Sequence, residues 1–304
     1  MKQEVLDNIY SFVDQYVYEE QLNTLIRAYI DNKSHERGFW SDLTITVHAM
    51  LGGASPDIYR LAAITELIIL ASDIIDDLQD QDHLDKPWMT EPQAYTLNAV
   101  VAMLVVFFGQ LSQLLEGKNQ AEALHVTSRI LMRSLNGQQK DLSNSVQTVD
   151  DYLVMVQEKS GSLIRLACYL GYVTLDCNEE TVNKLNDLAD CTGLIHQIEN
   201  DMKDLLGLDV KSDLVSKKRT LPLLYLILTD SELMIDELIT MGKAEALKII
   251  QDSGCVEYGK IVQSVCFTKA EEIFGGLQAQ SPWKEEYWEM MMGSFQLTVQ
   301  AIET

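Results

Sequence analysis

Carboxylate side chains gather at the end of one strongly apolar segment, ELIILASDIIDDLQD, residues 66–80. Asp76 and Asp80 are four residues apart, Asp77 and Asp80 are three apart, and Asp73 lies four before Asp77. On a helix these spacings place the side chains on a shared face within about one turn, where like charges destabilise one another. Mg²⁺ takes carboxylate oxygens and is usually completed by waters and substrate phosphates. The cluster therefore predicts a Mg²⁺ site, with a solvated acidic helix end as the alternative.

A second polar cluster occurs in GLIHQIENDMKDL, residues 193–205. Gln197, Asn200, Asp201 and Asp204 follow one another at three- and four-residue spacings, again at the end of an apolar helical stretch. Two such helices facing each other would form a cage for several Mg²⁺ ions and a diphosphate. Basic side chains that could bind the same diphosphate are Lys159, Lys217, Lys218 and Arg219, although each alone is also typical of a solvated surface.

The composition limits what kind of protein this is. The 304 residues are 47% hydrophobic and 23% charged, which suits a folded chain with a sizeable core. The formal net charge of −23 repels nucleic acid and anionic lipid, so a phosphorylated substrate would need metal ions to reverse the local sign. Five scattered cysteines suit reduced thiols. We expect a cytoplasmic enzyme with no nucleic-acid partner.

Membrane insertion is not expected. The start, MKQEVLDNIY, has no apolar signal core. The most apolar run, residues 99–111, is shorter than the roughly 20 residues of a membrane span and is typical of a core helix.

Helical periodicity dominates the chain, since apolar residues recur every three or four positions and no stretch alternates with period two. The longest expected helices cover residues 58–79, 96–116, 125–142, 149–173, 181–206 and 221–241. Expected loops are 81–92, 207–220 and 275–282. The fold class is therefore all-α, and no linker divides residues 1–304, so one domain is expected.

Five segments, in order, resemble the class I isoprenyl diphosphate synthase family of trans-prenyltransferases. Asp76, Asp77 and Asp80 match the first DDxxD motif, and NGQQKDL at 136–142 resembles GQxxDL. EKSGSL at 158–163 resembles the segment with KTGxL. HQIENDMKDL at 196–205 resembles the second aspartate-rich motif, and SDLVSKKRTLP at 212–222 resembles DLxxGKxTLP. The resemblance covers about residues 51–222.

The resemblance implies a single-domain helical bundle around a central active-site cavity, generally in a homodimer. The apolar run at residues 99–109 could serve the dimer interface, and it could equally be plain core. It implies three Mg²⁺ ions, with metal-binding positions at Asp76, Asp77, Asp80, Asn200, Asp201 and Asp204. It places Lys159 and Lys218 on the allylic diphosphate, Gln138 near the allylic tail and Asp141 near the metals, with Gln197 also in the substrate site. Asn200 departs from the pattern, because an amide replaces a carboxylate and removes one charge.

Basic residues of the chain-elongating members are missing. Their GKRxRP segment corresponds to residues 36–41 here, where only Arg37 is basic, and their Arg-Arg-Gly falls on Asp85 and Lys86. Arginine suits phosphate because its planar fork forms paired hydrogen bonds, whereas aspartate repels a second diphosphate. The acceptor is therefore expected to carry no diphosphate.

Within the family this pattern resembles the ComQ group, including the extra aspartate at position 73. That resemblance implies transfer of a geranyl or farnesyl group from its diphosphate to a tryptophan of a ComX-type pheromone precursor in quorum sensing and competence. Trp40 and Trp88 could line an apolar acceptor site or be ordinary half-buried aromatics. Small residues at Ala71 and Ser72 leave room for about fifteen carbons and favour farnesyl.

Three other functions remain open at this point. A short-chain synthase would condense isopentenyl diphosphate with the allylic substrate. A class I terpene cyclase would need only one diphosphate and no acceptor. A non-catalytic regulatory subunit would have no need of both metal motifs.

Overall fold

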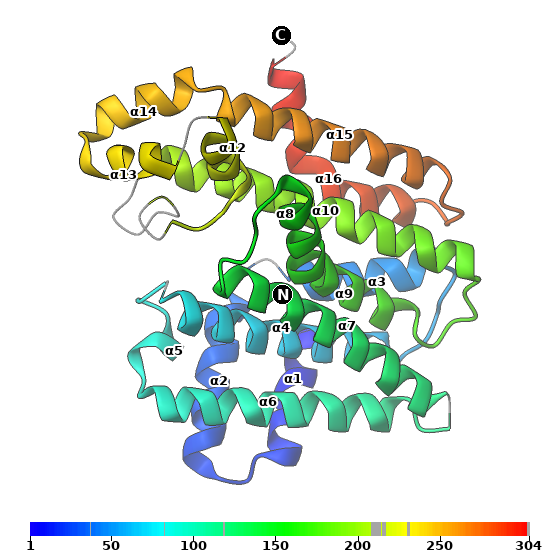
Figure 1. The fold of residues 1–304 in the computed structure, drawn as a ribbon. Coiled ribbons are helices and arrows are strands. Elements are labelled where there is room, and N and C mark those ends of the chain that lie inside the picture. The colour runs from blue at the N-terminus through cyan, green and yellow to red at the C-terminus, as the bar shows by residue number, and fades with distance from the viewer. Residues whose placement is uncertain are drawn as a thin grey trace. The chain divides into compact units, whose positions relative to one another are not determined.

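Helices make up the fold in this computed structural model, and no β-strand occurs in the residues that the structure describes (Figure 1). These are residues 1–36, 38–81, 83–117, 119–207, 214, 217–229 and 232–302. The all-α prediction is confirmed. The chain divides into two compact units, and three of the five unit boundaries fall within helices: α7 (Gln120–Leu142), α9 (Ser162–Tyr172) and α16 (Trp283–Ile302).

The first unit contains Met1–Arg129, Leu166–Asn178 and Gln278–Ser294. Its complete helices are α1 (Gln3–Tyr16), α2 (Glu20–Ser34), α3 (Phe39–Met50), α4 (Ile58–Asp80), α5 (Pro87–Thr90) and α6 (Gln93–Leu114). The central helix is α4, which packs against α1, α3 and α6. Its residues 61–71 are all buried, so α4 is a core helix on every side until it reaches the aspartates.

The second unit contains Ile130–Arg165, Glu179–Leu277 and Phe295–Thr304. Its complete elements are α8 (Val149–Val156), a π-helix η1 (Gln157–Gly161), α10 (Glu179–Gly207), α12 (Leu221–Thr229), α13 (Glu232–Thr240), α14 (Lys243–Asp252) and α15 (Cys255–Gly275). The long helix α10 packs along α15 and also contacts η1, α8 and α12.

Two expected helices differ from the observed elements. The stretch 149–173 stays helical, but η1 interrupts it between α8 and α9. The stretch expected as one helix at 221–241 forms α12 and α13 as two helices. Residues 230 and 231, between these two helices, lie outside the described residues. The other four expected helices are confirmed within a few residues at each end.

Helix α6 carries the apolar run at 99–111 and is only partly a core helix. Ala99, Met103 and Phe107 are buried, whereas Val101 and Val105 are more than half exposed. Among the described residues α6 alone is long and apolar enough to span a membrane by length and composition, and less than half of that stretch is buried within the protein. Of the two alternatives for this run, plain core therefore describes only one face of α6, and the other face is left open for an interface.

Candidate active site

The first aspartate cluster lies on the last turns of α4, in the first unit. Asp77 is buried: its Oδ1 lies 2.7 Å from Nδ1 of His83, and its Oδ2 accepts a 2.7 Å hydrogen bond from Nε1 of Trp88. Asp76 and Asp80 are half-buried. The motif thus combines one carboxylate held by neighbouring side chains with two that reach the surface.

The position of this cluster at a helix C-terminus favours cations. The last turn of α4 contains no basic residue, and Gln81 ends the helix with a left-handed backbone, φ 57°. Unpaired carbonyl groups give a helix C-terminus a partial negative charge, which adds to the charge of the three aspartates. A divalent cation is the simplest compensation for so much negative charge in one turn.

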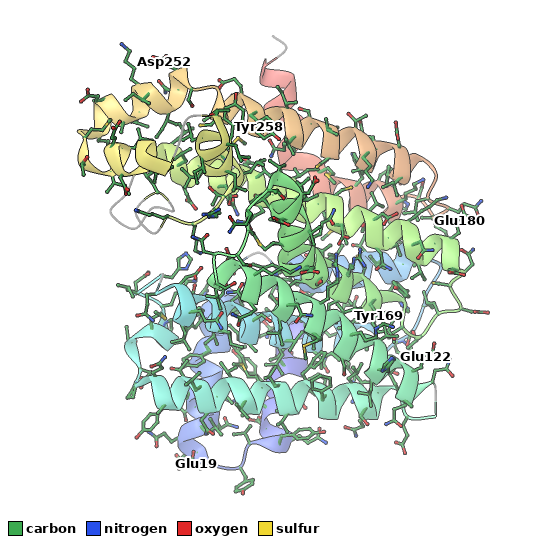
Figure 2. The ribbon with its side chains drawn as sticks, in the orientation of Figure 1. Glu19, Glu122, Tyr169, Glu180, Asp252 and Tyr258 are labelled. Carbon is green, nitrogen blue, oxygen red and sulfur yellow. The ribbon has the colours of Figure 1, made fainter. Side chains whose placement is uncertain are left out.

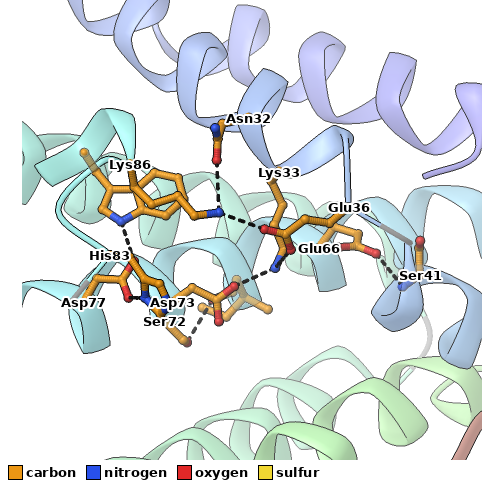
Figure 3. A network of polar contacts seen from close by, with 12 residues as sticks. Asn32, Lys33, Glu36, Ser41, Glu66, Ser72, Asp73, Asp77, His83 and Lys86 are labelled. Atoms are coloured by element: carbon orange, nitrogen blue, oxygen red, sulfur yellow. Dashed lines mark hydrogen bonds and ion pairs between the residues drawn. The ribbon is translucent and has the colours of Figure 1, made fainter. Parts of the chain in front are cut away.

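A second polar network joins α2, α4 and the segment before α5 (Figure 3). Lys33 Nζ lies 2.8 Å from Oδ2 of Asp73 and 2.7 Å from Oε2 of Glu36. Lys86 Nζ lies 3.1 Å from Oε1 of Glu36 and 3.3 Å from the side-chain oxygen of Asn32. We call Lys33, Glu36, Asp73 and Lys86 the lysine–carboxylate group. Its two lysines are neutralised by its two carboxylates.

Electrostatics within this group favour the charged forms of Lys33 and Glu36. Burial lowers the pKa of Lys33, but the carboxylates of Asp73 and Glu36 more than offset that effect and leave the pKa raised. Burial raises the pKa of Glu36, but the ammonium groups of Lys33 and Lys86 outweigh it, so the pKa is lowered. Burial raises the pKa of Asp73, although its 2.8 Å contact with the Lys33 ammonium group acts in the opposite sense.

The second aspartate cluster lies on the last turns of α10, in the second unit. Asp201 is buried, and its two oxygens accept hydrogen bonds from the Tyr152 hydroxyl at 2.6 Å and from Nε2 of Gln197 at 2.8 Å. Asn200 and Asp204 are exposed. The pattern is the same as on α4, because a held central carboxylate is flanked by accessible oxygen ligands.

Both lysines expected on the diphosphate contact the carboxylate of Asp141 in the second unit. Lys159 Nζ lies 2.7 Å from Oδ2 of Asp141, and Lys218 Nζ lies 3.9 Å from the same oxygen. Asn144, at the end of α7, donates to the carbonyl of Lys217 and accepts from the amide of Arg219, which fixes the backbone beside Lys218. A cavity of about 210 Å³ borders Lys217, Lys218 and Arg219.

Close approach of η1 to its neighbours sets the place of Lys159. A Cβ added to Gly137 of α7 would lie 2.3 Å from the backbone nitrogen of Lys159. A Cβ added to Gly193 of α10 would lie 2.8 Å from the backbone nitrogen of Gly161. Only glycine permits such contacts. Gln138 follows Gly137 directly and is buried, so the α7 motif and Lys159 share one local packing arrangement.

A buried ion group supports η1 and was not foreseen from the sequence. Asp190 of α10 accepts hydrogen bonds from Arg133 at 3.0 and 3.2 Å and also pairs with Arg165. Arg133 donates as well to the carbonyl of Gln157 at 2.7 Å and to Ser162 Oγ at 2.9 Å, one at each end of η1. No motif or regular spacing links these residues, so only the tertiary structure brings them together.

The acidic residues fit Mg²⁺ better than a metal enclosed by protein ligands alone. Within the described part of the chain, no three His, Cys, Asp or Glu side chains converge tightly enough to hold an ion by themselves. Mg²⁺ is commonly bound through one or two carboxylates, with waters and substrate phosphates completing the shell. Asp76 and Asp80 on α4, and Asn200 and Asp204 on α10, offer such partial ligand sets.

The structure distributes the expected site residues between the two units. Asp76, Asp77 and Asp80 belong to the first unit, and the other expected site residues belong to the second: Gln138, Lys159, Gln197, Asn200, Asp201, Asp204 and Lys218. Two expectations stay predictions: that the two clusters face each other, and that one domain spans residues 1–304.

Trp88 is 2% exposed and donates to Asp77, so it does not line an open acceptor site, whereas Trp40 is half-buried. Arg37 and residues 212, 213, 215 and 216 of the last motif lie outside the described residues.

Comparisons with known proteins agree with this arrangement. Tryptophan prenyltransferase ComQ of Bacillus spizizenii is 31% identical over 215 residues, 70% of this chain and 75% of that protein. Short chain isoprenyl diphosphate synthase of Methanocaldococcus jannaschii is 28% identical over 241 residues, 72% of each chain. The solved geranylgeranyl pyrophosphate synthase from Corynebacterium glutamicum, complexed with calcium and isoprenyl diphosphate, shares the fold. It has a TM-score of 0.74 at 18% identity and covers 96% of this chain and 95% of that one.

The polyprenyl synthetase family model matches residues 23–253, which include both aspartate clusters and all the diphosphate-binding candidates. That range contains the two acidic helix ends and the lysines around Asp141. The chain therefore belongs to the polyprenyl synthetase family and is a prenyltransferase.

Proposed function

We propose that this protein transfers a geranyl or farnesyl group from its allylic diphosphate to a tryptophan of a ComX-type peptide precursor. The reaction depends on Mg²⁺ and releases diphosphate. The similarity to a tryptophan prenyltransferase supports the acceptor, and family membership supports the allylic donor. Small side chains at Ala71 and Ser72, before the first aspartate motif, favour farnesyl as the donor.

The observation that carries the proposal is the pairing of Lys33 and Lys86 with carboxylates in the first unit. The ammonium groups of both lysines lie within 3.1 Å of the carboxylates of Asp73 or Glu36. Lys159 and Lys218, the lysines that the family resemblance places on the allylic diphosphate, both contact Asp141 in the second unit. The paired lysines of the first unit do not favour the binding of a second diphosphate there.

The proposed reaction needs an allylic donor that loses its diphosphate and an acceptor that carries no charge. The C1–O bond of the allylic diphosphate breaks, and its electron pair leaves with the diphosphate. Mg²⁺ supplies charge neutralisation of that leaving group, and Lys159 and Lys218 stabilise the negative charge that develops on it. Carbon 3 of the indole then forms a bond to C1 of the prenyl group. The backbone nitrogen closes a ring at carbon 2 and releases its proton.

The proposed ligands follow from exposure and hydrogen bonding. Asp76, Asp80, Asn200 and Asp204 present accessible oxygens for three Mg²⁺ ions and their bound diphosphate. Asp77 and Asp201 each accept hydrogen bonds through both oxygens, and a carboxylate oxygen can accept a hydrogen bond and bind a metal at the same time. Gln138 and Gln197 complete the substrate site.

The test gives the purified protein Mg²⁺, farnesyl or geranyl diphosphate and a ComX-type peptide with one tryptophan. Mass spectrometry should find the peptide heavier by one prenyl unit, and no gain in a matched peptide with phenylalanine at that position. A second tube replaces the peptide by isopentenyl diphosphate, and a third contains no acceptor. Longer diphosphates with an unchanged peptide would identify a short-chain synthase, the alternative that the 28% identical relative favours. A cyclic hydrocarbon in the third tube would identify a terpene cyclase.

We also propose that the protein is a cytoplasmic homodimer joined through α6. Tyr95, Leu97, Val101 and Val105 expose about half or more of their surface along this helix. A groove of about 530 Å³ beside them is lined by Val101, Leu104, Val105 and Phe108 of α6 together with Tyr16 of α1. An exposed apolar stripe of this kind is typical of a protein interface.

A further inference from the structure

Glu36 is the centre of the lysine–carboxylate group in the first unit (Figure 3). Its Oε2 contacts Lys33 at 2.7 Å and its Oε1 contacts Lys86 at 3.1 Å, so one side chain neutralises part of both lysines. Asp73 completes the neutralisation of Lys33 at 2.8 Å. The contacts link the residues just after α2, the last third of α4 and the segment before α5.

Two residues of this group lie in segments that resemble basic motifs of the elongating members of the family. Glu36 is the first residue of the segment that corresponds to the basic GKRxRP motif, and Lys86 falls on an Arg-Arg-Gly position. The structure brings the two together, although 50 residues separate them in the chain. The sequence shows a loss of basic residues, whereas the structure shows that the remaining ammonium groups are paired with carboxylates.

The exposure of the Glu36–Lys86 pair argues that this contact has a role other than stability, whereas the Lys33 side chain is 12% exposed. The Glu36 side chain is 43% exposed and the Lys86 side chain is 26% exposed. Ion pairs at such surfaces contribute little to folding, with a median of about 0–1 kcal/mol. The charge of the group nevertheless acts on any anion that approaches it, because two ammonium groups without carboxylates would attract a diphosphate.

We propose that Glu36 and Asp73 determine acceptor specificity by neutralising Lys33 and Lys86, so that an acceptor carrying a diphosphate is not bound. This inference deepens the proposed function and rests on it, because it gives the physical means by which a diphosphate acceptor is rejected while a neutral indole is not. Glu36→Gln changes the net charge of the group from 0 to +1. Glu36→Gln combined with Asp73→Asn changes it to +2.

The experiment measures isopentenyl diphosphate binding by titration calorimetry in buffer with EDTA, where the metal-dependent allylic site does not compete. The unaltered protein should bind weakly, and Glu36→Gln should bind at least tenfold more tightly. The double variant should gain a further increase of similar size. The gain should shrink as salt is added, because exposed charges are screened. Isopentenol, which lacks the diphosphate, should show no difference between the variants.

Glu116→Gln is the matched control, since Glu116 is exposed in the turn after α6 and outside the group. Equal affinity of Glu36→Gln and Glu116→Gln would overturn the inference, as would tight binding by the unaltered protein. Should the double variant lose its helical circular dichroism, the single variant decides alone. The peptide assay tests the proposed function separately. If Glu36→Gln binds isopentenyl diphosphate more tightly but the protein modifies no peptide, the proposed function is contradicted and the role of Glu36 is supported.

Discussion

Asp77 and Asp201 occupy equivalent places in the two acidic helix ends and have the same kind of surroundings. Each is buried, and each accepts one hydrogen bond from an aromatic side chain: the indole of Trp88 or the hydroxyl of Tyr152. A carboxylate held by two partners keeps its orientation, because its rotamer is fixed by those bonds. We infer that both residues position their exposed neighbours, Asp76 and Asn200, besides any metal contact of their own.

Replacing Asp76 or Asp80 by alanine should abolish diphosphate release. Losing a ligand of the metal that stabilises the leaving group removes several kcal/mol of transition-state stabilisation, so turnover should fall by about a thousandfold or more. Release is followed with a pyrophosphate assay, and circular dichroism should show unchanged helix content. Asp252→Ala, at the exposed end of α14, is the control (Figure 2). Retained turnover in either α4 variant would remove the metal assignment.

Trp88→Phe should destabilise the protein by about 2–4 kcal/mol. The variant loses a hydrogen bond to a charged acceptor, which contributes about 1.5–3 kcal/mol, and it also leaves unfilled volume. Urea unfolding measures the effect, with Trp283→Phe as a control at a tryptophan that is 38% exposed. A double-mutant cycle with Asp77→Ala, which removes the acceptor, isolates the interaction. Strictly additive effects would show that Trp88 and Asp77 do not interact.

At this scale the sequence identifies side chains but not their partners. The spacing of Asp76, Asp77 and Asp80 predicts a shared helix end, and all three lie there. Nothing in the sequence assigns Trp88 to Asp77, because the contact depends on how the segment after α4 folds back. Trp88 was a candidate for the acceptor site on residue type alone, and burial overrides that interpretation.

At the scale of elements, α3 and α4 are joined by a buried carboxyl group. Glu66 of α4 is 2% exposed, and its Oε1 accepts a 2.8 Å hydrogen bond from the backbone nitrogen of Ser41. Burial raises the pKa of Glu66 above its ordinary value of 4.5, although Ser41 acts in the opposite sense. The protonated form is therefore favoured in the folded protein relative to the unfolded chain.

The stability difference between Glu66→Gln and the unaltered protein should depend on pH. A raised pKa in the folded state contributes stability that is fully present below pH 4.5 and is lost as the pH rises through the raised value. Glutamine has no charge to bury and can accept the same hydrogen bond. The variant should therefore be more stable at pH 8, with the difference disappearing near pH 4. Urea unfolding at several pH values measures this, and a pH-independent difference would contradict the assignment.

Gly193→Ala should reduce both stability and activity. The new Cβ would lie 2.8 Å from the Gly161 nitrogen, so α10 and η1 must separate, at a cost of about 1–3 kcal/mol. The displacement should also move Lys159, two residues before Gly161, and lower the rate of diphosphate release. Gly242→Ala is the matched control, because no atom lies within 4 Å of its added Cβ. Equal behaviour of the two variants in unfolding and in release would contradict this packing account.

Helix positions were predictable where apolar periodicity is strong, and α4 and α10 match expectation within two residues at each end. The interruption at η1 was not predictable, because Gln157–Gly161 continues the helical pattern and the π-helix depends on Arg133, Asp190 and two glycine contacts. Its place beside Lys159 agrees with the frequent occurrence of π-helical turns at functional sites.

The net charge of the whole molecule is −23, so its surface repels anions. Diphosphate binding therefore depends on local cations and on Mg²⁺. The composition predicts this balance. It does not predict that one face of α6 stays apolar and exposed, since the same residues would fit a buried helix.

Val101→Glu combined with Val105→Glu should convert a dimer into a monomer. Two charges on the exposed stripe of α6 would have to lose water at the interface, which is strongly unfavourable without partners. Light scattering after size exclusion gives the mass, expected near 34.4 kDa for the variant and twice that for the unaltered protein. Ile261→Glu, at an exposed site on α15, is the control. A dimeric double variant would place the interface elsewhere, and a vesicle-bound unaltered protein would identify the stripe as a membrane contact.

The most direct test of the central claim is a competition between acceptors in one tube. The protein receives Mg²⁺, farnesyl diphosphate, and equal concentrations of isopentenyl diphosphate and a tryptophan-containing ComX-type peptide, and mass spectrometry quantifies where the prenyl group goes. The neutral lysine–carboxylate group predicts that the peptide takes nearly all of it and that no longer diphosphate accumulates. A majority of longer diphosphate would contradict the account and show that this chain elongates isoprenyl diphosphates.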